Sequence, residues 1–218
     1  HHNLPFRSLI KTREGSTNGN SYLCTLLGHP ATQATRWISP YRCFRTITRV
    51  IGRILARRLT TPPVIAFLRR FGQLAPTRHG AAILANLAGI TTTHGADITN
   101  AFNTLYRSFL LRAVVVFAPD AAQLTALLYT TPSRIDFGAA DVSPLRGVRQ
   151  GCPAAAPLFA LSVAYALSLA PSPPPVLMYA DDVIFDPTSD PAADYDATAA
   201  ALAPAGLSLK PLTVGNAT

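Results

Sequence analysis

The sequence predicts an α+β layer architecture, and three observations predict it. Apolar residues recur at helical spacing over residues 41–59, which is typical of an amphipathic helix. A long apolar stretch over residues 154–169 predicts a buried helix. Two β-forming runs flank Asp181 and Asp182 within residues 176–185, which predicts a hairpin with two acids at its tip. Because helices alternate with only a few strands, we expect both kinds of element to pack in layers.

Proline and glycine mark the boundaries of the other elements. Thr61-Pro62-Pro63 ends the helix over 41–59, and the prolines between Pro171 and Pro175 separate the buried helix from the hairpin. Residues 1–35 are expected to form mostly loop, with one strand near Phe6 to Lys11. The remaining expected elements are, in chain order, helices at 81–87, 100–112 and 121–129, an acidic loop at 186–196, a short Ala-rich helix and a last strand at 206–209.

Composition limits the classes of protein that the chain can represent. Its 218 residues, 49% of them apolar, suffice for one sizeable core, with or without a small satellite lobe. Cys24, Cys43 and Cys152 show neither disulfide nor zinc spacing, which favours a reducing, intracellular compartment, either nucleus or cytoplasm. The longest apolar run, 156–170, is shorter than the ~20 residues that cross a bilayer, so no membrane partner is expected. The chain begins without Met, and we expect it to be a piece of a longer protein.

Charge is distributed unevenly along the chain. Residues 1–96 hold thirteen Lys or Arg and a single acid, Glu14, whereas residues 97–218 hold six Lys or Arg and ten acids. The first part therefore carries a net charge of +12 and the second −4, which gives +8 for the whole chain. This asymmetry predicts polyanion binding in the first part and metal binding in the second. Ordinary solubilising charge is the alternative, but it does not explain why almost no acid is interspersed among the thirteen bases.

A stripe of arginines follows one face of the helix over 41–59. Its members lie opposite the apolar face and are Arg42, Arg45, Arg49, Arg53 and Arg57. No acid accompanies them, whereas a merely solvated helix face normally mixes in Glu. We therefore interpret Arg45, Arg49, Arg53 and Arg57 as contacts to a nucleic-acid backbone.

The adjacent carboxylates Asp181 and Asp182 are the strongest chemical signal. Two like charges held between strands are costly unless a cation binds them, and Mg²⁺ prefers carboxylate oxygens and substrate phosphates. A further carboxylate, Asp97, opens an expected strand-to-helix junction, Asp97-Ile98-Thr99-Asn100-Ala101-Phe102. Carboxylates from two strand ends can hold two metal ions about 3.5–4 Å apart for phosphoryl transfer. The alternatives are a solvated turn for Asp181 and Asp182 and a helix N-cap for Asp97.

A third segment, residues 146–153, lies between the two acidic ones. It reads Arg-Gly-Val-Arg-Gln-Gly-Cys-Pro, with glycines that allow close backbone approach to a nucleotide and with Gln150 as both donor and acceptor. In this order, the Asp97 segment, the loop from Gly147 to Pro153 and Tyr179-Ala180-Asp181-Asp182 resemble three motifs of reverse transcriptases. The likeness is strongest to those of non-long-terminal-repeat (LINE-like) retrotransposons.

This resemblance implies the fold of a right-hand polymerase. Its palm would be a small antiparallel sheet backed by helices over residues 97–218. A partial, helix-rich fingers subdomain and the lead-in to the palm would cover residues 1–96, where Arg36 to Leu59 and Gln73 to Leu87 resemble family segments. The thumb would be absent, and a thumb and an endonuclease region would belong to the rest of a retrotransposon polyprotein.

The resemblance also implies roles for single residues. Asp97, Asp181 and Asp182 would be catalytic, with two Mg²⁺ ions (Mn²⁺ as the alternative) held by Asp97, Asp181 and the backbone of Ile98. The ring of Phe102 would exclude the 2′-hydroxyl of a ribonucleotide, and packing in a helix core is its alternative role. The same resemblance implies that the nucleotide is contacted by Gln150, Gly151, Arg36 and Lys11. It also implies that nucleic acid is contacted by Tyr179.

The expected function is RNA-directed DNA polymerisation, in which a DNA primer on an RNA template is extended with deoxynucleoside triphosphates. Two departures from the family pattern stand out. Ala154-Ala155-Ala156-Pro157 replaces the usual Ser-Pro, and Thr213 occupies the usual place of a lysine that protonates pyrophosphate, with Lys210 offset from it. The alternatives are a catalytically inactive fragment that still binds nucleic acid and an RNA-directed RNA polymerase palm, against which Phe102 argues.

Overall fold

The computed structural model describes residues 40–77, 79–83, 86, 93–130, 135–136, 141–142, 146–149, 151–186 and 188–215. The chain divides into two compact units, His1–Ile47 and Thr48–Thr218, and the fold below is that of the second unit. Helix α2 (Pro40–Leu59), expected from the sequence, begins in the first unit and ends in the second. The strand expected near Phe6 to Lys11 lies outside the described residues.

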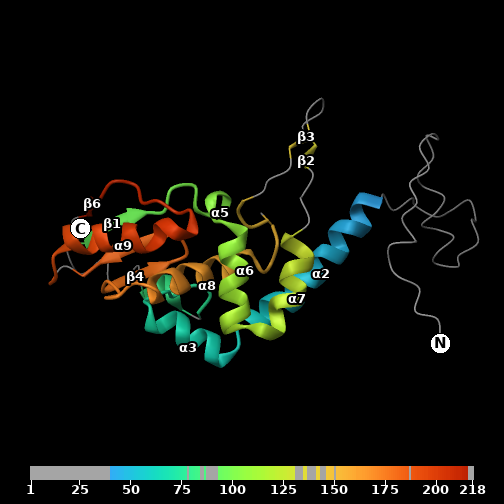
Figure 1. Cartoon of the computed structure of the whole chain (residues 1–218), viewed down its shortest axis with the longest axis horizontal. Helices are drawn as coiled ribbons and strands as arrows, with labels where there is room; N and C mark the ends of the chain where they lie inside the picture. The colour runs from blue at the N-terminus through green and yellow to red at the C-terminus, as the bar shows by residue number, and fades with distance from the viewer. Residues whose placement is uncertain are drawn as a thin grey trace, which may run out of the picture. The chain divides into compact units, whose positions relative to one another are not determined.

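This unit contains a four-stranded antiparallel sheet (Figure 1). Its strand order is β4-β5-β1-β6, so β1 lies between β5 and β6 although it comes first in the chain. The hairpin expected from the sequence is confirmed as β4 and β5, joined by Ala180 and Asp181. The strand bounds are β1 (Thr93–Asp97), β4 (Val176–Tyr179), β5 (Asp182–Phe185) and β6 (Thr213–Gly215).

Strand β1 has few β-forming residues, and its pairing explains why it is a strand. Its sequence, Thr-His-Gly-Ala-Asp, lacks the Val and Ile that favour strands, but it pairs on both edges. A Cβ added to Gly95 would lie 3.3 Å from the carbonyl oxygen of Val183, so this position is closely packed. Tertiary pairing therefore overrides local propensity in β1.

The last strand lies later in the chain than the sequence predicts. The expectation of a strand at 206–209 is wrong, because Leu209 forms only an isolated antiparallel bridge to Ile98. The strand itself is β6, four residues further on, and Thr213 within it donates a side-chain hydrogen bond to Gly95 O at 2.9 Å. The segment between them carries Lys210 past the end of β1.

Helix α8 is the core helix of the unit, as its apolar sequence predicts. It spans Ala155–Ser168 and packs with α3, α6 and α9 (Figure 1). Its only fully buried hydroxyl, that of Ser162, donates to Leu158 O at 2.8 Å and is thereby satisfied within the helix. The neighbouring helices are α3 (Pro62–Arg70), α5 (Ala101–Thr104), α6 (Arg107–Phe117), α7 (Pro119–Tyr129) and α9 (Pro191–Leu202).

Three helix boundaries differ from the expectation, each for a local reason. The single helix expected at 100–112 is two helices, α5 and α6, because the backbone of Tyr106 pairs with Arg146 and its N–H donates to Ala205 O at 2.8 Å. Pro62, expected only to end a helix, also begins α3, since proline suits the first helical turn. The acidic loop stops at Asp190, whose carboxylate caps α9 by accepting from Ala192 N and Ala193 N.

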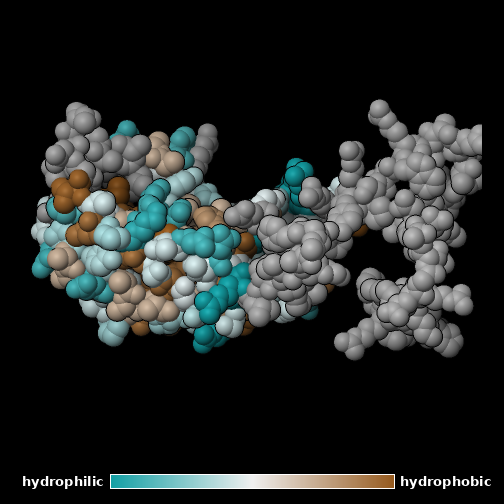
Figure 2. All heavy atoms as spheres, turned by 90° about the horizontal axis from the view of Figure 1, so that it is seen from above, coloured by the Kyte–Doolittle hydropathy of each residue, from teal (hydrophilic) through white to brown (hydrophobic). Residues whose placement is uncertain are grey.

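Only part of the apolar face of α2 is buried. Leu55 and Leu59 are fully buried, whereas Ile47 and Val50 are at least half exposed. Figure 2 shows hydrophilic and hydrophobic residues interspersed over the visible face of the described residues. No described helix combines the length and the apolar character that crossing a bilayer requires. A short two-stranded sheet, β2 (Ile135–Asp136) with β3 (Asp141–Val142), completes the described elements.

Candidate active site

Strand register brings the predicted carboxylates to one end of the sheet. Asp97 is the last residue of β1 and Asp182 the first of β5, and the two are direct cross-strand partners. Directly opposed residues have Cβ atoms about 4.5–5.5 Å apart. Asp181, in the turn, is tied to the same end because its carbonyl oxygen accepts from Ile98 N at 2.9 Å. Acids from two distant parts of the sequence therefore meet at one place.

Asp97 is not a helix N-cap, which was the alternative for this residue. The N-cap of α5 is Asn100, whose φ of 47° lies in the left-handed region. The expected strand-to-helix junction is therefore confirmed, with the carboxylate at the strand end and a short helix following it.

Lys210 contacts Asp97 directly, a role that the sequence did not indicate. The Lys210 ammonium donates to Asp97 Oδ2 at 2.6 Å, and the two side chains are 54% and 45% exposed. The Lys210 backbone N–H also donates to Asp97 O at 2.8 Å, which holds the segment after α9 beside β1. The neighbouring residues Ile98 and Leu209 form a backbone bridge that brings Lys210 and Asp97 together. No local sequence pattern encodes that bridge.

The charges at this end of the sheet perturb one another. The hydrogen bond from Lys210 is the main cause that lowers the pKa of the Asp97 carboxyl. Burial, followed by the hydrogen bond to Asp97 and the charge of Asp181, raises the pKa of the Asp182 carboxyl. The Lys210 ammonium has a raised pKa, chiefly through its hydrogen bond to Asp97. The Lys210 ammonium bonds to Asp97, and the charges of Asp181 and Asp182 also act on it, so the cluster holds excess negative charge.

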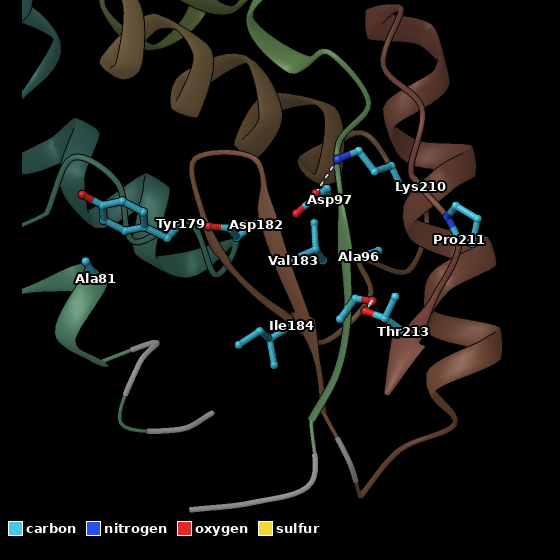
Figure 3. A pocket seen from close by; sticks show the side chains of 11 residues that line it. Ala81, Ala96, Asp97, Tyr179, Asp182, Val183, Ile184, Lys210, Pro211 and Thr213 are labelled. Carbon is cyan, nitrogen blue, oxygen red and sulfur yellow. Dashed lines mark hydrogen bonds and ion pairs between the residues drawn. The ribbon is translucent and has the colours of Figure 1, made fainter. Parts of the chain in front are cut away.

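A cavity of about 470 Å³ opens beside this cluster (Figure 3). Asp97 and Asp182 line it together with Tyr179, Lys210 and Thr213. The floor is made of small and apolar strand residues, including Ala96 and Val183, while Ala81 lines it from the other side of the hairpin (Figure 3). The cavity combines an apolar floor with charged groups at one end, which is typical of a binding site.

The side chains of the cluster are of the chemical type that binds divalent cations, but a metal site here stays a prediction. Carboxylate oxygens are the ligands that Mg²⁺ prefers, and an unneutralised group of acids gains most from one. Within the described part of the chain, no group of three or more His, Cys, Asp or Glu side chains is arranged to hold a metal ion. Asp97 Oδ2 accepts from Lys210, so a cation that bound Asp97 would share this carboxylate with the ammonium.

Two other predicted site residues have defined surroundings. Phe102 stacks on Phe159 of α8 at 4.8 Å between ring centroids, so its ring packs against the core helix. Gly151 has a φ of 76° and is exposed, and a Cβ added there would meet nothing within 4 Å. Its backbone is therefore open to approach, and its contact with a nucleotide stays a prediction. The buried Ile98 contributes its N–H to the bond with Asp181, and its role as a backbone metal ligand stays a prediction.

The predicted nucleic-acid contacts are described only in part. Arg49, Arg53 and Arg57 of α2 are exposed and recur every four residues, so they share one helix face. Arg45 belongs to the same helix, but its side chain lies outside the described residues. Gln150, Lys11 and Arg36, predicted to contact the nucleotide, also lie outside the described residues.

Comparisons with known proteins add no family to this geometry. No protein-family model matches the chain, and no curated protein matches it significantly. Any function assigned to the chain therefore depends on its motifs and on the site itself.

Proposed function

We propose that this chain is the catalytic module of an RNA-directed DNA polymerase of the LINE-like reverse transcriptase kind. The observation that carries the proposal is the meeting of Asp97 with the Asp181–Asp182 turn at one sheet end, beside an open cavity. Two of the three motifs that resemble this family supply those acids, one from a strand end and the other from a hairpin turn.

The residues of the cluster suit charge stabilisation of a polyphosphate. Bound divalent cations would activate a primer 3′-hydroxyl and stabilise the triphosphate and the departing pyrophosphate. Asp97 and Asp181 would hold these cations, and Asp182, at the same turn, would support their binding. Lys210 lines the cavity and places a positive charge at its edge, where phosphate oxygens would lie.

The surface chemistry supports a nucleic-acid substrate. The exposed arginines of α2 offer a row of guanidinium groups spaced along one helix face, which suits a phosphate backbone. The sugar preference in this proposal depends on Phe102, which stacks on Phe159 of the core helix and is not among the residues that line the cavity beside Asp97. Exclusion of ribonucleotides by this ring remains part of the proposal.

Primer extension tests the proposal directly. The chain is incubated with an RNA template, a DNA primer, deoxynucleoside triphosphates and Mg²⁺, and incorporation is followed on a gel. Asp181→Ala is expected to reduce incorporation by at least about a hundredfold without changing the folded circular dichroism spectrum. The control is Asp196→Asn, an exposed acid on α9 outside the cavity. Normal extension by Asp181→Ala contradicts the assigned role.

A nucleic-acid-binding module without catalysis is the second candidate function. The Lys210–Asp97 ion pair favours it, because the ammonium already neutralises part of the negative charge that would attract a metal ion. Binding that weakens steeply with salt, with no incorporation by the unmodified chain, would establish this candidate. An RNA-directed RNA polymerase would be recognised by preferential incorporation of ribonucleotides over deoxynucleotides in the same assay.

A further inference from the structure

Gln73 is a fully buried polar residue that bonds to the turn carrying the acids. Its side-chain oxygen accepts from Ala180 N at 3.1 Å and from Ala75 N at 3.0 Å. Its side-chain NH₂ donates to Ala180 O at 3.2 Å. One side chain therefore satisfies both backbone polar groups of Ala180, the residue before Asp181.

The turn needs such support because its backbone is strained. Ala180 has a φ of 55°, in the left-handed region that alanine adopts only at a cost. Strained backbone of this kind persists where surrounding contacts determine it and is concentrated at functional sites. Without Gln73, the turn would keep only its hairpin pairing and the bond from Ile98 N to Asp181 O.

Gln73 is itself held rigidly on the outer edge of β4. Residues on either side of it bond to Met178, with Leu74 N donating to Met178 O at 2.7 Å and Met178 N donating to Gly72 O at 2.9 Å. A Cβ added to Gly72 would lie 1.8 Å from Val176 O, so a larger residue at position 72 could not keep this approach. The segment is therefore a fixed support, from which Gln73 reaches the turn.

We propose that Gln73 is a positioning residue that sets the conformation of the Ala180–Asp181 turn and thereby the placement of Asp181 and Asp182 relative to Asp97. This rests on the proposed function, since the carboxylates that it positions are those of the polymerase site. Gln73 does not line the cavity, so its effect on chemistry passes through the backbone of Ala180.

Gln73→Met tests the proposal, because methionine keeps the length of the side chain and removes its hydrogen bonds. The first readout is amide hydrogen exchange, which does not depend on activity. The Ala180 amide is expected to exchange at least about tenfold faster in Gln73→Met, whereas the amides of β5 that pair with β1 keep their rates. The second readout is kinetic, with kcat expected to fall by about a hundredfold and the KM for nucleotide unchanged, because a small misplacement of catalytic groups has this effect.

A matched control separates positioning from general destabilisation. Thr125 is also fully buried, and its hydroxyl donates to Ala121 O at 2.8 Å within α7. Thr125→Val therefore removes a buried hydrogen bond away from the cavity and is expected to leave kcat and Ala180 exchange unchanged. Should Gln73→Met fail to fold, Gln73→Asn keeps an uncharged amide on a side chain one methylene shorter, which would not reach Ala180, and the same faster exchange of the Ala180 amide is expected.

The outcomes distinguish this inference from the proposed function. Absence of nucleotide incorporation by the unmodified chain contradicts the polymerase proposal. Faster exchange of the Ala180 amide in Gln73→Met would still establish that Gln73 holds the turn. Unchanged Ala180 exchange overturns the inference, whatever the activity. Equal losses of kcat in Gln73→Met and Thr125→Val overturn it as well, because the effect would then reflect stability alone.

Discussion

The acidic end of the sheet and the arginine face of α2 differ in charge and in how the chain builds them. Asp97, Asp181 and Asp182 come from separate segments and meet only through strand register. Arg49, Arg53 and Arg57 are neighbours through the helical repeat alone. A slip of one residue in register would turn every strand side chain to the other face, whereas the helix face tolerates local change. The proposed chemistry would thus depend on a few groups brought together by register, whereas the proposed binding surface would be distributed over several similar side chains.

Removing one acid tests the acidic end of the sheet and has the largest expected effect. Asp97→Asn keeps the size of the side chain and removes its charge, and we expect nucleotide incorporation to fall by at least about a hundredfold. Binding of primer–template, measured by fluorescence anisotropy, is expected to stay within about twofold, because Asp97 contacts no arginine of α2. A parallel loss of binding would show that the two regions are not separable.

Removing the exposed arginines of α2 together tests the proposed nucleic-acid-binding face. Arg49→Gln, Arg53→Gln and Arg57→Gln in one chain are expected to weaken nucleic-acid binding and to reduce the slope of log K against log salt by about 2–3, since each phosphate contact contributes about 0.7–0.9. Single-turnover incorporation at saturating primer–template is expected to be unchanged. An unchanged salt slope would mean that these arginines do not contact phosphate.

The sequence predicted what depends on local pattern. The helix over 41–59, the buried α8 and the hairpin that carries Asp181 and Asp182 are confirmed, because periodicity and β-forming runs encode them directly. The α+β class follows from these elements, and the antiparallel sheet agrees with it. The resemblance to reverse transcriptases stays a prediction.

Features that depend on contacts distant in sequence were missed. The break between α5 and α6 arises where Tyr106 pairs with Arg146, and the contact of Lys210 with Asp97 arises from the bridge to Ile98. Gln73 was noted only as part of a family-like segment, although its buried amide faces a strained turn. A single polar residue between Gly72 and Leu74 gives no local sign that it will bond to a hairpin 107 residues away.

Two Ala→Gly substitutions compare the strained backbone of the Ala180 turn with ordinary helix backbone. Ala180→Gly removes the Cβ from a left-handed residue and is expected to raise the free energy of unfolding by about 0.5–1 kcal/mol. The same exchange in the middle of α9, Ala197→Gly, is expected to lower it by about 1 kcal/mol, since glycine is a poor helix former. Urea unfolding measures both. The same sign for both variants would mean that the φ of 55° at Ala180 carries no strain.

The smallest expected effect concerns the charge excess of the acidic cluster. Because the pKa of Asp182 is raised in the folded chain, its contribution to stability is greatest below the pKa of the unfolded residue, about 3.9, and is lost as the pH rises through the folded value. At pH 7 the charged Asp182 therefore destabilises the metal-free fold. Asp182→Asn is expected to raise Tm by about 1–3 °C at pH 7 and by nothing measurable near pH 3.5.

The exposed Asp196→Asn serves as the control for this measurement, since it lies outside the cluster and should leave Tm unchanged at both pH values. Adding Mn²⁺ sharpens the comparison, because a cation that binds the folded cluster stabilises the unmodified chain by mass action. The Mn²⁺-dependent rise in Tm is expected to be smaller in Asp182→Asn, which has one carboxylate fewer. A lower Tm for Asp182→Asn at pH 7 without metal would show that the charged Asp182 is stabilised by its neighbours. The cluster would then hold no excess of negative charge for a metal to neutralise.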